Sequence, residues 1–119
     1  MRVLLVEDEP MNADLFVDAL EPERHEVVVE DDGLRGLARA GSERFDLIVL
    51  DMNLPGMSGA EICRSLRAAG TTTPIVALSA SVLPNELAAG LRAGFDAYLT
   101  KPIAPLDLRA AVRRYGKPA

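Results

Sequence analysis

The chain has 119 residues, 49% of them hydrophobic, and a formal net charge of −5 at pH 7. This length and composition predict one folded domain and exclude intrinsic disorder, and no apolar run approaches the roughly 20 residues that a membrane span needs. The acidic balance argues against direct contact with a nucleic-acid backbone, and the single cysteine cannot form an internal disulfide. We therefore expect a cytoplasmic protein that binds neither nucleic acid nor membrane.

Short apolar segments alternate along the chain with segments of helical periodicity. Most of the apolar segments are continuous, without polar alternation, which is typical of strands buried on both faces of a parallel sheet. We expect strands at residues 3–6, 26–30, 47–50, 75–78 and 97–99.

Capping residues and apolar spacing predict a helix after each strand. Asp32 can cap the second helix, and Ser58 with Glu61 forms a capping box at the start of the third. The expected helices are 10–20, about 32–41, 58–70, 84–93 and 105–115. Gly90 makes the fourth helix a weak one, because glycine is unfavourable in a helix interior.

This order of elements predicts an α/β fold, a doubly wound five-stranded parallel sheet covered by helices on both faces. One domain would span residues 1–119, with residues 116–119 as a short tail. Because Met1 directly precedes the first strand and no residues remain for an output module, we expect a stand-alone domain, although excision from a longer chain is an alternative.

Polar residues follow four of the five predicted strands. Glu7 and Asp8 come after the first, and single polar side chains follow the third, fourth and fifth, namely Asp51, Ser79 and Lys101. Ligands of open parallel sheets bind at the carboxyl ends of the strands, so these side chains are expected to share one crevice. Such a set suits a divalent cation and a phosphoryl group. The acidic residues 30–32 also end a strand, but we interpret them as capping and solvated groups.

The order of these residues resembles the receiver domain of two-component response regulators over nearly the whole chain, and is similar to stand-alone chemotaxis and cell-cycle receivers. The matching residues are Glu7, Asp8, Asp51, the segment 54–59, Ser79, Ala80, Tyr98, Lys101 and Pro102. The resemblance implies a flavodoxin-like (βα)5 fold with strand order 2-1-3-4-5, and a cis peptide bond before Pro102.

The resemblance also implies a metal site. Asp8 and Asp51 would bind Mg²⁺ directly, with Mn²⁺ as a possible substitute, and the backbone carbonyl of Asn53 would be the third ligand. Glu7 would act through a water, although its longer side chain leaves direct ligation open. Clustered carboxylates repel one another unless a cation neutralises them, which supports this interpretation.

Asp51 would be the phosphorylation site, because a carboxylate that attacks phosphorus forms an acyl phosphate that can be lost again. Lys101 and Ser79 would neutralise phosphoryl oxygens during the transfer. By the same resemblance, the switch residues would be Ser79, which moves toward the modified aspartate, and Tyr98, which rotates inward past the small Ala80. Two further residues, Asn53 and Ser81, flank the path of an attacking water and would modulate dephosphorylation.

The resulting hypothesis is a single-domain response regulator, not an enzyme in the usual sense, that assists its own phosphorylation and dephosphorylation. A histidine kinase or a histidine phosphotransfer protein would supply the phosphoryl group. A downstream protein would read the surface of the fourth and fifth helices and the last strand, with an adaptor favoured over a relay intermediate. The chain would be a monomer or a weak dimer.

Two other functions are compatible with parts of the pattern. A Mg²⁺-dependent aspartyl phosphohydrolase of the haloacid dehalogenase type would need a second acid two positions after Asp51, where Asn53 stands. A receiver-like module that binds partners without phosphorylation would not need the intact acidic and basic residues. Separately, the apolar arc of helix 10–20 is wider than a core contact requires, so it either docks a kinase helix or packs against neighbouring loops.

Overall fold

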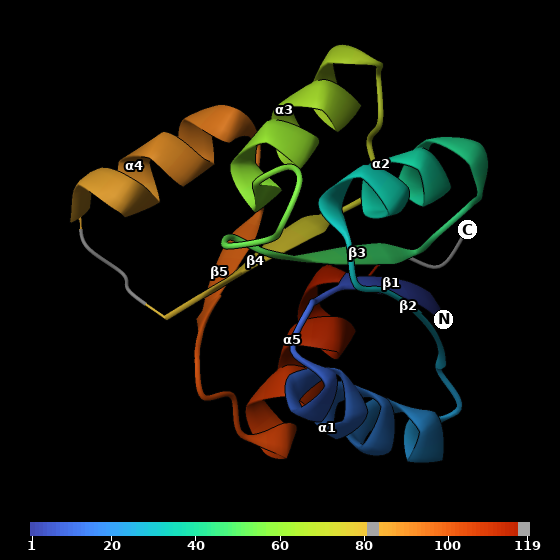
Figure 1. Ribbon diagram of the computed structural model, residues 1–119. Helices are drawn as coiled ribbons and strands as arrows, with labels where there is room; N and C mark the ends of the chain where they lie inside the picture. The colour runs from blue at the N-terminus through green and yellow to red at the C-terminus, as the bar shows by residue number, and fades with distance from the viewer. Residues whose placement is uncertain (81–83, 117–119) are drawn as a thin grey trace.

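The computed structural model describes residues 1–80 and 84–116. Five parallel strands form one sheet in the order β2-β1-β3-β4-β5, which confirms the predicted topology. Helices α1 and α5 cover one face, and α2, α3 and α4 cover the other (Figure 1). The strands are β1 (Arg2–Val6), β2 (Glu26–Glu30), β3 (Leu47–Asp51), β4 (Ile75–Ser79) and β5 (Ala97–Thr100). The helices are α1 (Pro10–Leu20), α2 (Gly33–Ser42), α3 (Gly59–Ala68), α4 (Pro84–Ala93) and α5 (Pro105–Tyr115), with a 3₁₀ turn at Glu21–Glu23 that was not predicted.

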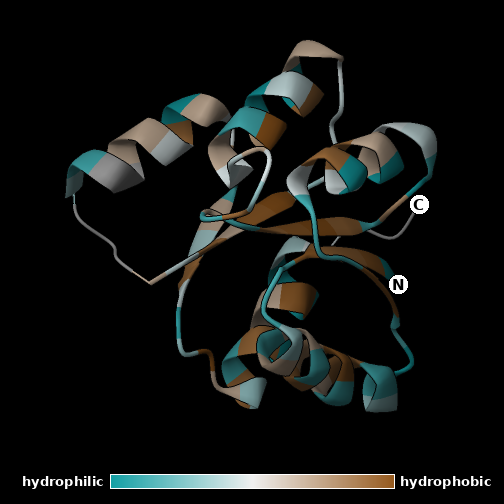
Figure 2. Cartoon of the chain, viewed as in Figure 1, coloured by the Kyte–Doolittle hydropathy of each residue, from teal (hydrophilic) through white to brown (hydrophobic). Residues whose placement is uncertain are grey.

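The sheet separates two apolar cores. All five residues of β3 and of β4 are buried, as the continuous apolar runs predicted, because helices cover both faces of these central strands. Hydrophobic residues concentrate in the strands and on the inward helix faces, while hydrophilic residues lie on the outer faces of the helices (Figure 2). No helix in the described ranges has the length and apolar character required to cross a bilayer.

Three strands extend one residue beyond their predicted ends, and in each case the added residue is polar. Asp51, Ser79 and Thr100 are the last residues of β3, β4 and β5. The chain after these residues still pairs with its neighbour, because the Met52 N–H donates to the Leu78 carbonyl at 3.0 Å and the Lys101 N–H to the Ser79 carbonyl at 2.8 Å. The backbone of the functional residues is therefore held by the sheet.

The helix starts agree with the predicted capping residues. The Asp32 carboxylate accepts the N–H groups of Leu34 and Arg35 at 2.8 and 3.1 Å, which confirms that Asp32 caps α2. Glu30 of the same acidic segment is not a solvated group as predicted, because it forms a 3.5 Å ion pair with Arg39 and its side chain is only 16% exposed. Ser58 Oγ accepts the Glu61 N–H at 3.2 Å. The N-cap of α1 is Glu9, so Glu7 and Asp8 precede the capping position. The peptide bond between Lys101 and Pro102 is cis, as the resemblance implied.

Candidate functional site

The parallel register brings the carboxyl ends of four strands to one edge of the sheet. Val6 is paired with Leu50, Asp51 with Leu78, and Ser79 with Thr100. The residues that follow β1 and β5 therefore meet the last residues of β3 and β4. The sheet thus assembles the side chains that the sequence placed at separate strand ends.

Three carboxylates cluster at this edge. One oxygen from each of Glu7, Asp8 and Asp51 lies within 4.8 Å of the others. Glu7 and Asp51 are buried, at 1% and 3% exposure, while Asp8 is exposed. Two buried acids beside an exposed one form a site that is open to solvent on one side, as a cation with remaining water ligands requires.

Lys101 partly neutralises this cluster. Its Nζ lies 2.8 Å from Asp51 Oδ2 and 3.0 Å from Glu7 Oε1. The ammonium is not aligned for a hydrogen bond to Glu7 Oε1, so this buried oxygen has no hydrogen-bond donor among residues 1–80 and 84–116. A buried acceptor in this state fits a metal ion or a metal-bound water as its missing partner. The residues present therefore fit a hard divalent cation such as Mg²⁺.

The pKa values of the two buried acids shift in opposite directions. Burial, and then a hydrogen bond shared with Asp51, raise the pKa of Glu7 to about 7. Burial also opposes ionisation of Asp51, but hydrogen bonds from Glu7, Lys101 and the Asn53 backbone outweigh it and lower the Asp51 pKa. Burial likewise opposes the charge on Lys101, yet its contacts with both acids raise its pKa overall. Without a cation, the protonated member of the pair near neutral pH is Glu7.

The Asp51 side chain is held by both of its oxygens. Oδ1 accepts the backbone N–H of Asn53 at 3.1 Å, and Oδ2 accepts the Lys101 ammonium at 2.8 Å. Gly59 permits this placement, because a Cβ there would overlap the Asp51 carbonyl at the start of α3. Asp51 is thus a positioned and ionised carboxylate at the edge of the sheet.

A cavity of about 230 Å³ lies beside the carboxylates and collects most of the other predicted residues. Its wall is formed by Met52, Asn53, Ser58, Ala60, Ser79, Ala80 and Tyr98. The proposed roles of the Asn53 carbonyl, Ser79, Ala80 and Tyr98 remain predictions, but these residues do line one space. Ser81, the other residue expected to modulate dephosphorylation, lies outside the described residues.

The sequence did not show that Glu7 would be the second partner of Lys101. The prediction treated Glu7 as a metal-site residue that acts through water, whereas the structure buries its carboxylate against the ammonium. The available signal was its position directly after four fully buried residues, Val3 to Val6, since a side chain at the end of such a strand has little access to solvent.

Comparisons with known proteins agree with this geometry. The family model for the response regulator receiver domain matches residues 3–113. Response regulator ArlR of Staphylococcus saprophyticus is 41% identical over 112 residues, which cover 94% of this chain and 50% of ArlR. Sensor histidine kinase AruS of Pseudomonas aeruginosa is 39% identical over 120 residues, 98% of this chain and 12% of AruS. The chain spans half or less of the length of these curated relatives.

Solved structures show the same fold. The chemotaxis protein CheY4 of Vibrio cholerae superposes with a TM-score of 0.90 at 31% identity, over 96% of this chain and 97% of that one. The receiver domain of a sensor histidine kinase from Pseudomonas aeruginosa gives a TM-score of 0.87 at 33% identity, over 96% of this chain and 95% of that one. That second structure is described with a magnesium ion coordinated in its active-site cleft.

Proposed function

Because this chain belongs to the response regulator receiver family of two-component signalling, we propose that its Asp51 accepts a phosphoryl group from a phosphohistidine with the help of Mg²⁺. The observation that carries the proposal is the setting of Asp51. Its carboxylate is held by the Asn53 N–H and the Lys101 ammonium, within 4.8 Å of two further acids.

The proposed transfer forms one bond and breaks one. A carboxylate oxygen of Asp51 bonds to phosphorus while the P–N bond of the phosphohistidine breaks, and the electron pair returns to the imidazole nitrogen, which takes up a proton. Lys101 already lies 2.8 Å from Asp51 Oδ2, so its ammonium can neutralise a phosphoryl oxygen that arrives there. Asp8, Asp51 and the Asn53 carbonyl would hold Mg²⁺, with Glu7 acting through a water, and the cation would supply positive charge for another phosphoryl oxygen.

Mass spectrometry tests this function directly. With Mg²⁺ and acetyl phosphate, the protein should gain one phosphoryl group, and hydroxylamine should remove it because it cleaves acyl phosphates. Omission of Mg²⁺ should reduce the rate of labelling strongly. A label that resists hydroxylamine, or one that forms equally well without a divalent cation, would contradict an aspartyl phosphate formed at this site.

We propose that the phosphorylated form acts as an adaptor through the α4–β5–α5 surface, and that a downstream protein reads it. This face offers exposed apolar side chains, with Leu91 on α4 62% exposed and Leu106 on α5 75% exposed. A cavity of about 420 Å³ lies between the outer edge of β5 and α5. Exposed apolar residues beside a cavity support binding of a protein at this face.

We propose that the phosphohistidine donor docks on α1. Ala13, Phe16 and Leu20 face the core, while Met11 and Leu15 are 74% and 55% exposed, so neighbouring loops do not cover them. Leu15 also lines a small cavity with Asn12, Phe16, Lys101, Pro102, Ile103, Pro105 and Leu108. A helix seated there would lie next to Lys101 and hence to Asp51.

Replacement of Leu15 by glutamine should slow phosphotransfer from a histidine kinase about tenfold, as expected for an apolar anchor in a protein interface. The kinase for this test is selected from a panel of autophosphorylated histidine kinases, as the one that phosphorylates the unmodified chain fastest. Labelling by acetyl phosphate should not change, because this small donor needs no docking surface. Leu34→Gln on α2, where the leucine is 60% exposed, is the matched control. An equal loss in both variants, or a loss with acetyl phosphate, would rule out docking on α1.

A further inference from the structure

The side chain of Tyr98 occupies the space where any residue other than glycine at position 90 would have its Cβ. A Cβ on Gly90 would overlap the hydroxyl oxygen and Cζ of Tyr98 and lie 2.7 Å from Cε2. Gly90 is buried within α4 and is not among the glycines with positive φ. Its lack of a side chain therefore serves this close approach, and not an unusual backbone conformation.

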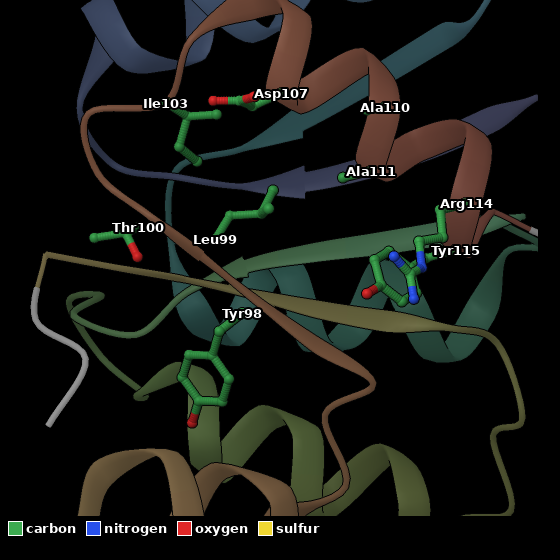
Figure 3. Close-up of a pocket in the computed structure, with 9 residues that line it drawn as sticks. All are labelled: Tyr98, Leu99, Thr100, Ile103, Asp107, Ala110, Ala111, Arg114 and Tyr115. Carbon is green, nitrogen blue, oxygen red and sulfur yellow. The ribbon is translucent and has the colours of Figure 1, made fainter. Parts of the chain in front are cut away.

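Tyr98 contributes to the walls of two cavities. It lines the cavity of about 230 Å³ with Ser79 and Ala80, and also the cavity of about 420 Å³ with Leu99 and Tyr115. In Figure 3 the ring points away from α5 and toward the helices on the opposite face of the sheet. The Phe95 ring supports it there, with centroids 5.7 Å apart and the planes tilted by 58°.

The end of α4 nearest this contact is held firmly. Arg67 on α3 donates to the Gly94 carbonyl through Nε and Nη2 at 3.0 and 2.9 Å. The same guanidinium forms a 2.9 Å ion pair with Asp96 and donates to the carbonyls of Thr71 and Thr73. Because Gly90 lies one turn before Gly94, this network fixes its position relative to β5, and α4 has little freedom to withdraw from a larger side chain.

We propose that Gly90 is a positioning residue that seats the Tyr98 ring against α4, and that this seat sets the resting shape of the wall between the Asp51 site and the α4–β5–α5 surface. The link between the seat and signalling rests on the proposed phosphoryl-acceptor function. The seat itself does not, because steric exclusion at position 90 acts whether or not Asp51 is modified. A side chain at position 90 would displace the ring toward solvent.

Fluorine NMR can observe this residue alone. The chain has two tyrosines and no tryptophan, so 3-fluorotyrosine in a Tyr115→Phe background reports only Tyr98. Gly90→Ala should shift this resonance and increase its exposure to a soluble paramagnetic reagent. Gly41→Ala on α2, where a Cβ meets nothing within 4 Å, should leave the resonance in place. An unshifted Tyr98 resonance in Gly90→Ala would overturn the proposal.

Thermal unfolding supplies a second test. It distinguishes a steric contact between Gly90 and Tyr98 from a purely structural role of the glycine. In a Tyr98→Ala background, Gly90→Ala should raise Tm by about 4 °C, because alanine is the better helix former and the ring is absent. With Tyr98 present, the same substitution should lower Tm. An equal Tm change in both backgrounds would contradict the seat.

The two proposals fail separately. Beryllofluoride with Mg²⁺ should shift the Tyr98 resonance of the parent protein, and should shift it much less in Gly90→Ala, where the alanine side chain keeps the ring out of its seat. A resonance that moves with Gly90→Ala but never with beryllofluoride would keep the seat and remove its link to Asp51. Absence of acetyl phosphate labelling would contradict the phosphoryl-acceptor function and leave the seat intact.

Discussion

Asp51→Asn should lower phosphoryl incorporation by roughly 10³-fold or more under conditions that label the unmodified protein completely, as loss of an attacking group does in other covalent mechanisms. The amide has nearly the same shape, and its oxygen can still accept the Asn53 N–H that now binds Oδ1 at 3.1 Å. The fold should therefore persist while the ionised nucleophile is absent. Intact-mass spectrometry after incubation with acetyl phosphate and Mg²⁺ measures the effect.

The matched control for this substitution is Asp31→Asn. Asp31 also follows a strand, but it lies at the β2 edge of the sheet and is exposed. It should be labelled like the unmodified chain. Equal labelling of Asp51→Asn and Asp31→Asn would remove Asp51 as the acceptor, and peptide mapping would then identify the modified residue.

Glu7→Gln should stabilise the metal-free protein at pH 8 and leave its stability at pH 5 nearly unchanged. In the folded chain the pKa of Glu7 is raised to about 7, whereas the unfolded value is 4.5. An acid with a raised folded pKa loses stability as the pH rises from its unfolded to its folded pKa. Complete ionisation therefore costs the folded state about 3 kcal/mol above pH 7, and glutamine avoids this cost. Urea unfolding in EDTA at both pH values measures the difference.

Added Mg²⁺ should reverse the order of the two proteins. The cation stabilises the ionised form of Glu7, so it should raise the unfolding free energy of the unmodified chain more than that of Glu7→Gln. Asp18→Asn, at an exposed position of α1, should show neither effect. A gain in stability for Glu7→Gln of equal size at pH 5 and pH 8 would mean that charge burial is not its cause.

The periodicity of the chain was sufficient to predict the order of strands and helices. The strand ends differed by one residue, because Asp51, Ser79 and Thr100 are polar but still belong to the sheet. The apolar pattern ends at the first polar side chain, whereas backbone pairing continues to the last hydrogen bond, such as that from Lys101 N–H to the Ser79 carbonyl. The pattern therefore located the functional residues while assigning three of the strand ends one position too early.

By itself, the sequence determined which residues could form the site, because Asp8, Asp51, Ser79 and Lys101 follow or end buried strands whose carboxyl ends meet in a parallel sheet. Only the tertiary structure decided which of their atoms are in contact. The pairing of Glu7 with Lys101 joins residues 94 positions apart, and the contact of Tyr98 with Gly90 depends on how closely α4 approaches β5. Such contacts arise when separate elements pack in three dimensions, and a linear pattern carries neither the distance nor the direction between them.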